Sequence, residues 1–185
     1  MEDEEIIDLF YARSEFAIEA VSDKYGATCK KIANNILNNK QDAEECVNDT
    51  YLGLWESIPP NRPNPLLSYI CRIVRNISIK KYHYNKAKKR NSTYDMALDE
   101  LEDCIASAVT VEGAFNTVQL TEVLNSFLET LDKKNRIIFV RRYWFSDSIS
   151  DIANMMHTSG HNITVRLSRL RGKLEKYLKK EGIWI

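Results

Sequence analysis

The sequence predicts an all-α protein made of two small helical domains joined by an acidic linker, the second domain ending in a helix-turn-helix. Apolar residues recur at helical spacing through most of the chain. The 185 residues include only six Gly and four Pro, which is few for a turn-rich sheet protein. All four prolines lie in residues 59–65, where they force a short extended loop between helices.

The first domain, residues 1–90, contains three helical patterns. The first ends at the pair Asn38-Asn39, the second starts at Asp42, and the third follows the proline loop and runs into a basic stretch. Residues three and four apart share one face of a helix, so each apolar series is expected to face the core. The series are Val21, Tyr25, Thr28, Ile32 and Ile36; Ala43, Val47, Tyr51, Leu54 and Ile58; and Leu66, Ile70, Ile73 and Ile77.

Residues 91–112 have weak periodicity and an acidic character, which indicates a linker with a short helix near residues 96–101. The second domain, residues 113–185, opens with two further helical patterns. They cover residues 118–131 and 133–144 and lead directly into the helix-turn-helix.

The segment 148–177 is the most informative part of the sequence. Ser148 and Ser159 are good N-cap residues for two helices around a tight turn. One face of the second helix is apolar and the other is polar and basic, which suits a DNA major groove. The alternative to a DNA-binding helix-turn-helix is an amphipathic helical hairpin whose basic face contacts only solvent. The apolar residues are Ile163, Leu167, Leu170 and Leu174; the polar face presents His161, Asn162, Val165, Arg166, Ser168, Arg169 and Lys176.

The formal net charge is zero, but the charges are segregated along the chain. Residues 72–94 contain eight bases and no acid, and residues 159–180 contain seven bases and one acid. Residues 1–23 contain eight acids and one base, and residues 95–112 contain six acids and no base. Two basic segments separated by an acidic one indicate that the protein contacts one polyanion at two places. The alternative is that the basic segments are solvent-exposed faces without a partner, which would explain one basic segment better than two.

Several classes of site find no support in the sequence. The cysteines, Cys29, Cys46, Cys71 and Cys104, lie far apart without a C-x-x-C pair, so we expect neither a metal site nor a redox motif. No common nucleotide-binding, zinc-protease or nucleophile-elbow motif occurs, so we expect no catalytic residue and no cofactor. No segment approaches the ~20 apolar residues of a membrane span, and the N-terminus is too acidic for a signal peptide. We therefore expect a cytoplasmic protein that is not an enzyme.

The order of these parts resembles the bacterial extracytoplasmic-function (ECF) sigma factors, the small promoter-recognition subunits of RNA polymerase. Residues 42–55, DAEECVNDTYLGLW, resemble the family's polymerase-docking helix. Residues 66–79, LLSYICRIVRNISI, resemble the helix that opens and reads the −10 element, with Tyr69 in place of the usual Trp. Residues 151–174 fit the −35-reading helix-turn-helix. His157 stands in place of the turn glycine there, so we expect it to take a positive φ.

The resemblance implies three sets of site residues. The polymerase-binding set, expected to contact the clamp helices of the largest subunit, is Asp42, Glu45, Asn48, Asp49 and Leu52. The −10 DNA-binding set is Asn61, Asn64, Arg72, Arg75, Asn76, Lys80, Lys81 and His83. The −35 DNA-binding set is Ser159, His161, Asn162, Thr164, Val165, Arg166, Ser168, Arg169 and Arg171.

Roles within the −10 set follow from the same resemblance. The family holds a flipped, single-stranded base near the loop that corresponds to residues 59–65, and Asn61 and Asn64 would supply amide hydrogen bonds there. The side chains expected to neutralise backbone phosphate are Lys80, Lys81 and His83. Tyr82 or Tyr84 would stack on an exposed base or, equally well, pack on the helix surface.

The predicted function is therefore to direct RNA polymerase core to promoter DNA and to initiate transcription. An anti-sigma factor is a further partner that the family implies. The alternative is a stand-alone transcription regulator that uses the same helix-turn-helix. That alternative leaves the helix of residues 42–55 and the proline loop without a role.

Overall fold

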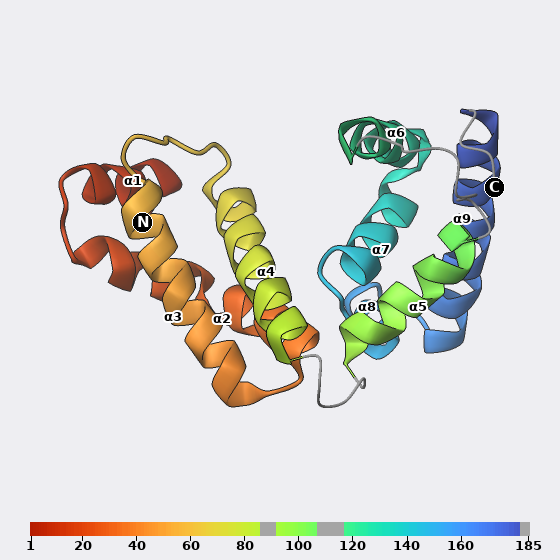
Figure 1. The fold of residues 1–185 in the computed structure, drawn as a ribbon, viewed down its shortest axis with the longest axis horizontal. Coiled ribbons are helices and arrows are strands. Elements are labelled where there is room, and N and C mark those ends of the chain that lie inside the picture. Colours follow the sequence, from red (N-terminus) through yellow and green to blue (C-terminus); the bar gives the residue numbers. More distant parts are fainter. Residues whose placement is uncertain (86–91, 107–116, 182–185) are drawn as a thin grey trace. The chain divides into compact units, whose positions relative to one another are not determined.

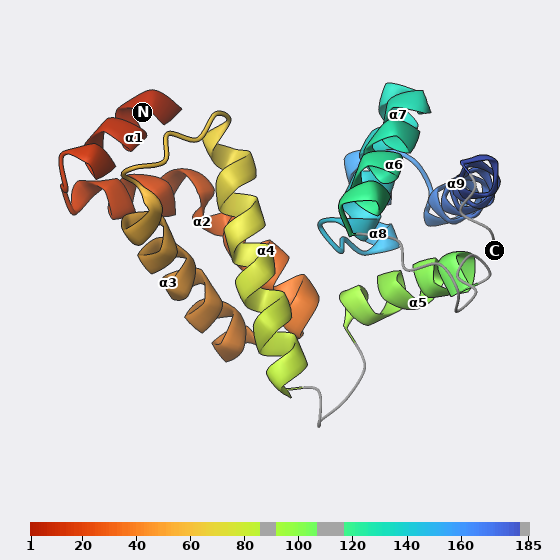
Figure 2. The ribbon, with the colours of Figure 1, turned by 45° about the horizontal axis from the view of Figure 1, so that its top comes forward.

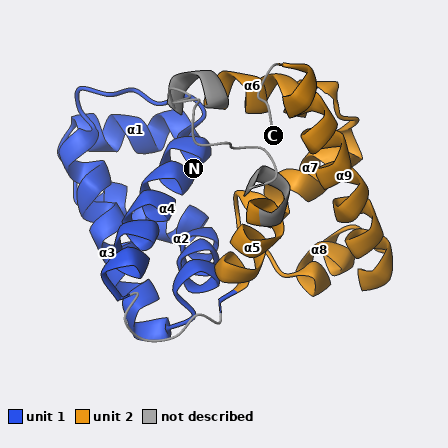
Figure 3. Ribbon diagram, turned by 45° about the vertical axis from the view of Figure 1, so that its right-hand side comes forward, with its two compact units in different colours: residues 1–92 blue, residues 93–185 orange. Residues whose placement is uncertain are grey.

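Helices alone make up the regular structure of the residues that the computed structural model describes, 1–85, 92–106 and 117–181. They form two compact units, residues 1–92 and 93–185, which Figure 3 colours separately. The all-α prediction is therefore confirmed within these ranges. No helix among the described residues is both long and apolar enough to cross a bilayer.

The first unit contains α1 (Asp3–Tyr11), α2 (Phe16–Leu37), α3 (Lys40–Ser57) and α4 (Leu66–Asn85). The helices α2, α3 and α4 pack against one another in pairs, and α1 packs against α2. Figures 1 and 2 show α1 at the end of the bundle where α3 leads into the proline loop. The loop and the N-terminal helix are therefore neighbours in this unit.

Two asparagines make the predicted break between α2 and α3. Asn38 ends α2 in the left-handed region at φ 47°, a conformation that asparagine adopts more readily than most residues. The side chain of Asn39 accepts hydrogen bonds from the N–H groups of Gln41 and Asp42, at 3.0 and 3.2 Å. This N-cap satisfies donors that the first turn of α3 would otherwise leave unpaired, so the helix begins at Lys40.

The buried face of α4 is displaced by part of a turn from the predicted one. Leu66 and Ile70 are fully buried as expected, but the next inward residue is Val74, and Ile73 and Ile77 are half-buried. Because α4 contacts both α2 and α3, its inward face is wider than a single stripe. Also buried on this face are Cys71 and Ser78.

The second unit contains α5 (Thr93–Ala106), α6 (Thr117–Thr130), α7 (Lys133–Tyr143), α8 (Ile149–Met155) and α9 (Gly160–Lys180). Helix α9 contacts each of the other four, so it forms the centre of this unit. The apolar stripe predicted for α9 is at most 2% exposed and packs in the core. Its members are Ile163, Leu167, Leu170 and Leu174.

The structure differs from the expected linker over residues 93–106. These residues form α5, which packs against α7 and α9 within the second unit. Tyr94 and Ala97 are buried and Leu101 packs against the core, so the helix has an apolar stripe with intervals of three and four. The short helix predicted near residues 96–101 is therefore present but longer than expected, because the acidic residues around this stripe weaken its periodic signal. The second unit thus begins at Thr93 rather than at residue 113; residues 107–112 lie outside the described residues.

The helix-turn-helix prediction is confirmed by α8, α9 and the turn between them. Ser148 Oγ accepts a hydrogen bond from the Asp151 N–H at 3.1 Å, and Ser159 Oγ accepts one from the Asn162 N–H at 3.2 Å. Both predicted N-caps are therefore present. His157 takes φ 50°, the left-handed conformation expected of it.

Candidate nucleic-acid and protein interfaces

The outward face of α9 forms a hollow of about 480 Å³ beside the N-terminal end of α7. Five of the nine residues predicted to contact the −35 element line it, and of these five only Val165 is half-buried, the others being exposed. Amide, imidazole and guanidinium groups on one helix face have the chemistry to contact base edges and phosphates. The hollow is lined by Asn135, His161, Asn162, Val165, Arg166, Arg169, Leu170 and Lys173.

Asn135 of α7 and the N-cap Asp132 belong to the surroundings of this hollow, and the sequence did not predict them. Arg166 Nη1 donates to Asn135 Oδ1 at 3.3 Å, across 31 residues of sequence. Asp132 accepts a hydrogen bond from the Asn135 N–H at 3.0 Å. That backbone hydrogen bond, with a smaller contribution from the Arg166 charge, lowers the pKa of Asp132. An acidic side chain is therefore bonded to Asn135, one of the residues that line the basic hollow.

Three members of the −35 set use polar atoms within their own helix. The Ser159 hydroxyl caps α9, and the Thr164 hydroxyl donates to the Gly160 carbonyl at 3.0 Å. Asn162 Nδ2 donates to Thr158 Oγ1 at 3.1 Å, which fixes the orientation of its exposed amide. His161, Arg166, Ser168 and Arg169 are exposed on the same helix.

Arg171 lies in a different environment from the rest of the −35 set. Its Nη1 donates to Glu100 Oε2 at 3.1 Å and to Tyr143 Oη at 3.0 Å, and its side chain is 25% exposed. The structure therefore places Arg171 in an internal contact with α5 rather than on the hollow. The expectation that it belongs to the −35 DNA-binding set does not fit this geometry.

Glu100 is the centre of that contact. Its carboxylate accepts hydrogen bonds from Arg142 Nη2 at 2.7 Å and Nε at 3.3 Å, and from Tyr143 Oη at 3.1 Å. Arg142 is 1% exposed, and its Nη1 donates to the Asp147 carbonyl at 3.0 Å. Burial, more than any neighbouring charge, raises the pKa of Tyr143 to about 12. We call these residues (Glu100, Arg142, Tyr143 and Arg171) the Glu100 cluster.

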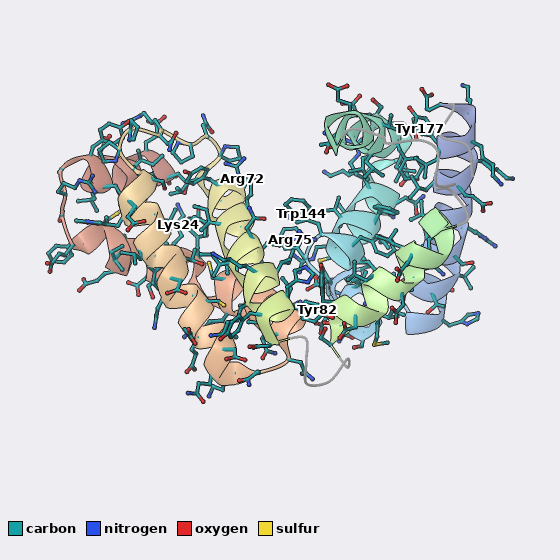
Figure 4. The ribbon with its side chains drawn as sticks, in the orientation of Figure 1. Lys24, Arg72, Arg75, Tyr82, Trp144 and Tyr177 are labelled. Atoms are coloured by element: carbon teal, nitrogen blue, oxygen red, sulfur yellow. The ribbon has the colours of Figure 1, made fainter. Side chains whose placement is uncertain are left out.

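In the first unit, the predicted −10 residues of α4 extend along the helix, where Figure 4 labels Arg72, Arg75 and Tyr82. The Arg72 guanidinium lies 5.3 Å from the centre of the Tyr69 ring. Arg72, Asn76, Lys80 and His83 are exposed, whereas Arg75 is half-buried. Of the two candidate stacking residues, Tyr82 is half-buried beside His83, and Tyr84 is 86% exposed. The basic residues 86–90 lie outside the described residues.

Lys81 is bound to the predicted polymerase-binding helix. Its Nζ donates to both carboxylate oxygens of Glu45 at 2.8 Å. One turn away, Asn85 Nδ2 donates to Asp42 Oδ2 at 3.0 Å. A residue predicted to contact DNA and one predicted to contact polymerase are therefore partners in this structure, which the sequence patterns did not indicate.

The outward face of α3 is acidic and has one large apolar residue. Asn48 and Asp49 are exposed, and Leu52 is 56% exposed. Residues 42–55 contain four acids and no base. An exposed leucine between acids and amides suits a protein partner with a basic rim better than it suits DNA.

The proline loop before α4 presents Asn61 and Asn64, both of which are exposed. Asn61 Nδ2 donates to the Ser57 carbonyl at 2.9 Å and contacts Tyr69 Oη at 3.4 Å. The loop also contacts α1 through Tyr11 and Arg62, which the sequence reading did not select because pairs about 50 residues apart leave no periodic signal.

The thiols of the first unit are buried. Burial raises the pKa of Cys29 to about 12, and Cys46 and Cys71 are likewise enclosed. Among the described residues, no group of three or more metal-binding side chains lies together.

Comparison with known proteins adds to this geometry. Residues 22–90 match the family model for sigma-70 region 2. A search of curated proteins found no match. Among solved structures, the chain is similar to CnrH in complex with the cytosolic domain of CnrY, at 17% sequence identity and a TM-score of 0.44, over 96% of this chain and 97% of CnrH.

Proposed function

We propose that this chain is an ECF-type sigma factor, with its sigma-70 region 2 at residues 22–90, and that its two units divide promoter recognition between them. The first unit docks on RNA polymerase core and engages the opened −10 strand. The second unit binds the duplex −35 element. The observation that carries this division is the coexistence of a region 2 unit with a second unit whose helix-turn-helix exposes a basic hollow.

In the second unit, we assign base contacts to the N-terminal part of α9 and phosphate contacts to its arginines. His161, Asn162 and Val165 lie in the first turns of the helix, the part that reaches base edges in a helix-turn-helix. Arg166 and Arg169 line the same hollow and supply the charge for phosphates. Arg171 is removed from this set because the Glu100 cluster holds it.

In the first unit, we assign the −10 strand to the proline loop and the outer face of α4. Asn61 and Asn64 present amides for the edge of a flipped base, while Arg72, Lys80 and His83 supply positive charge for the backbone. Lys81 contributes only after it releases Glu45. Tyr84 is the better candidate for base stacking, because its ring is almost fully exposed.

Docking on polymerase is assigned to the outward face of α3, with the clamp helices of the largest subunit as its partner. Asn48, Asp49 and Leu52 form the centre of this surface. On the strength of the ECF resemblance, we further propose an anti-sigma factor as a partner and a cytoplasmic location. Sigma factors are not a class of enzymes, and no catalytic role is proposed for this chain.

Transcription with purified components tests the proposal. The full chain is combined with bacterial core polymerase and a library of supercoiled templates that carry random promoter-length inserts. We expect transcripts that depend on the chain and start at a fixed distance from two shared sequence blocks. A stand-alone regulator would give no initiation with core alone, so the absence of chain-dependent transcripts would contradict the proposal.

A further inference from the structure

We propose that α1 braces the proline loop and that Asp8 and Tyr11 are positioning residues for reading the −10 strand. This inference rests on the proposed function of the loop. It adds a role for the N-terminal helix, which neither the sequence patterns nor the matched region, residues 22–90, include.

The loop needs support from outside itself because of its composition. Residues 58–65 contain four prolines, which have no N–H group to donate to neighbouring carbonyls. The Asn61 N–H donates back to the Ser57 carbonyl at 3.1 Å, a hydrogen bond that joins the segment to the end of α3. Contacts with another helix therefore add to the few hydrogen bonds that the segment makes near its own start.

Helix α1 supplies such contacts at two points. Tyr11 Oη donates a hydrogen bond to the Pro60 carbonyl at 2.8 Å. Arg62 Nη2 lies 2.7 Å from Asp8 Oδ1, and the Arg62 guanidinium lies 5.4 Å from the centre of the Tyr11 ring. Asp8 and Tyr11 are three residues apart and share one face of the helix, so both contacts come from the same side.

The turn after α1 is fixed to the same end of the unit. Arg13 Nη1 donates to the Trp55 carbonyl at 2.6 Å, and its guanidinium lies 5.3 Å from the centre of the Trp55 ring. The Phe10 and Trp55 rings pack edge to face, with centroids 6.2 Å apart. Helix α1 is thus fixed to the C-terminal end of α3, where the proline loop begins. Its contacts with the loop therefore hold the loop in a defined position relative to α3.

The consequence falls on Asn61, the residue between the two braced positions. Pro60 is held through its carbonyl and Arg62 through its guanidinium, while the Asn61 amide is held by the Ser57 carbonyl. A side chain that is already oriented loses less freedom when it binds a base, so the brace increases affinity and selectivity without contacting DNA.

The experiment uses the full chain bound to core polymerase and a pool of single-stranded oligonucleotides randomised over the −10 positions. Tyr11→Phe removes only the hydroxyl that holds Pro60, and Asp8→Asn removes the charge that orients Arg62. For each variant we expect a loss of about three- to tenfold in affinity for the preferred strand, the loss typical of one hydrogen bond. The difference in affinity among the four bases should become smaller at one position of the strand and stay unchanged at the others.

Two further measurements separate positioning from folding. The thermal unfolding midpoint should stay near that of the wild type, because both contacts are exposed. Hydrogen exchange at the backbone amides of Asn61 and Arg62 should become faster. Asp23→Asn, which removes an exposed acid from α2, should change neither the base preference nor the exchange.

Unchanged base preference and unchanged loop exchange in both variants would overturn the brace. If wild-type protein showed no base preference at all, the proposed function of the loop would fail and the positioning role would fail with it. The exchange measurement needs no DNA, so it distinguishes the two failures.

Discussion

Two exposed residues of α9 have different expected effects when removed. Asn162 lies in the first turn with its amide oriented by Thr158, and Arg169 lies farther along the same hollow. We expect Asn162→Ala to change sequence preference and to cost about 1–3 kcal/mol on the preferred −35 duplex. Arg169→Ala should weaken all duplexes alike and reduce the slope of log K against log salt by roughly one.

Fluorescence anisotropy over a panel of duplexes at several salt concentrations separates these two effects. Lys179→Ala is the control, because this exposed lysine near the end of α9 is paired with Glu175 at 2.9 Å and lies outside the hollow. Identical behaviour of the Asn162 and Arg169 variants across the panel would contradict the division between base and phosphate contacts.

The turn between α8 and α9 depends on the residue at position 157. His157 has φ 50°, where a β-branched side chain clashes with the backbone. We expect His157→Val to lower the free energy of unfolding by about 1–2 kcal/mol, whereas His157→Gly should retain it within about 1 kcal/mol. Denaturant unfolding checks this. Equal stability of the Val and wild-type proteins would show that the turn can take another conformation.

At the residue scale, the sequence predicted what depends on near neighbours. The caps Ser148 and Ser159 follow from residues at most a few positions away. The positive φ of His157 was expected from the family resemblance, in which a glycine stands at this turn. Arg171 was placed on the DNA face because its partner Glu100, 71 residues earlier, is invisible to a helical pattern. Long-range partners of this kind determine which arginine side chains of a basic helix are available to contact DNA.

At the scale of elements, α5 is longer than the predicted short helix near residues 96–101 and is part of the second unit rather than of a linker. Glu100 pairs with the buried Arg142, and breaking such a pair leaves an uncompensated buried charge. We expect Glu100→Gln to destabilise the second unit by on the order of 3 kcal/mol. Denaturant unfolding, followed by a probe in residues 117–181, measures the effect.

The matched control is Glu102→Gln, which removes the same charge from an exposed position of α5. We expect it to change the free energy of unfolding by less than about 0.5 kcal/mol, as surface substitutions usually do. If Glu100→Gln were no more destabilising than this control, α5 would not be an integral part of the second unit.

Most helices could be predicted from periodicity because their apolar stripes are long and regular, as in α9. For α5 only a short helix near residues 96–101 could be predicted, since its apolar stripe is short and its surroundings are acidic; its full length and its packing in the second unit could not. The rotation of the α4 face also escaped prediction, because a sequence pattern does not show how many neighbours a helix contacts. Both differences come from tertiary packing, which overrides local patterns.

At the scale of the whole molecule, the net charge is zero although residues 72–94 and 159–180 are basic and α3 is acidic. The proposed function rests on the order of three patterns rather than on any one, since each pattern alone also fits a plain helical protein. The match of residues 22–90 to sigma-70 region 2 contains the first two patterns, residues 42–55 and 66–79. The contact of Glu45 with Lys81 did not follow from sequence, because the docking helix and the basic run were treated separately.

The central claim is that the outward face of α3 docks on RNA polymerase core, and one substitution tests it most directly. Asp49→Lys reverses a charge at an exposed position, whereas reversing Glu45 would also break its ion pair with Lys81. Tagged full chain is used to purify core polymerase from a bacterial lysate, with Asp23→Lys on α2 as the control. Circular dichroism verifies that the helices remain.

We expect the Asp23 variant to bring down core at the wild-type yield and the Asp49 variant to lose at least about 90% of it, because repulsion replaces attraction at the interface. Recovery of core by the folded Asp49→Lys protein at the wild-type yield would contradict the assignment of α3 as the docking helix.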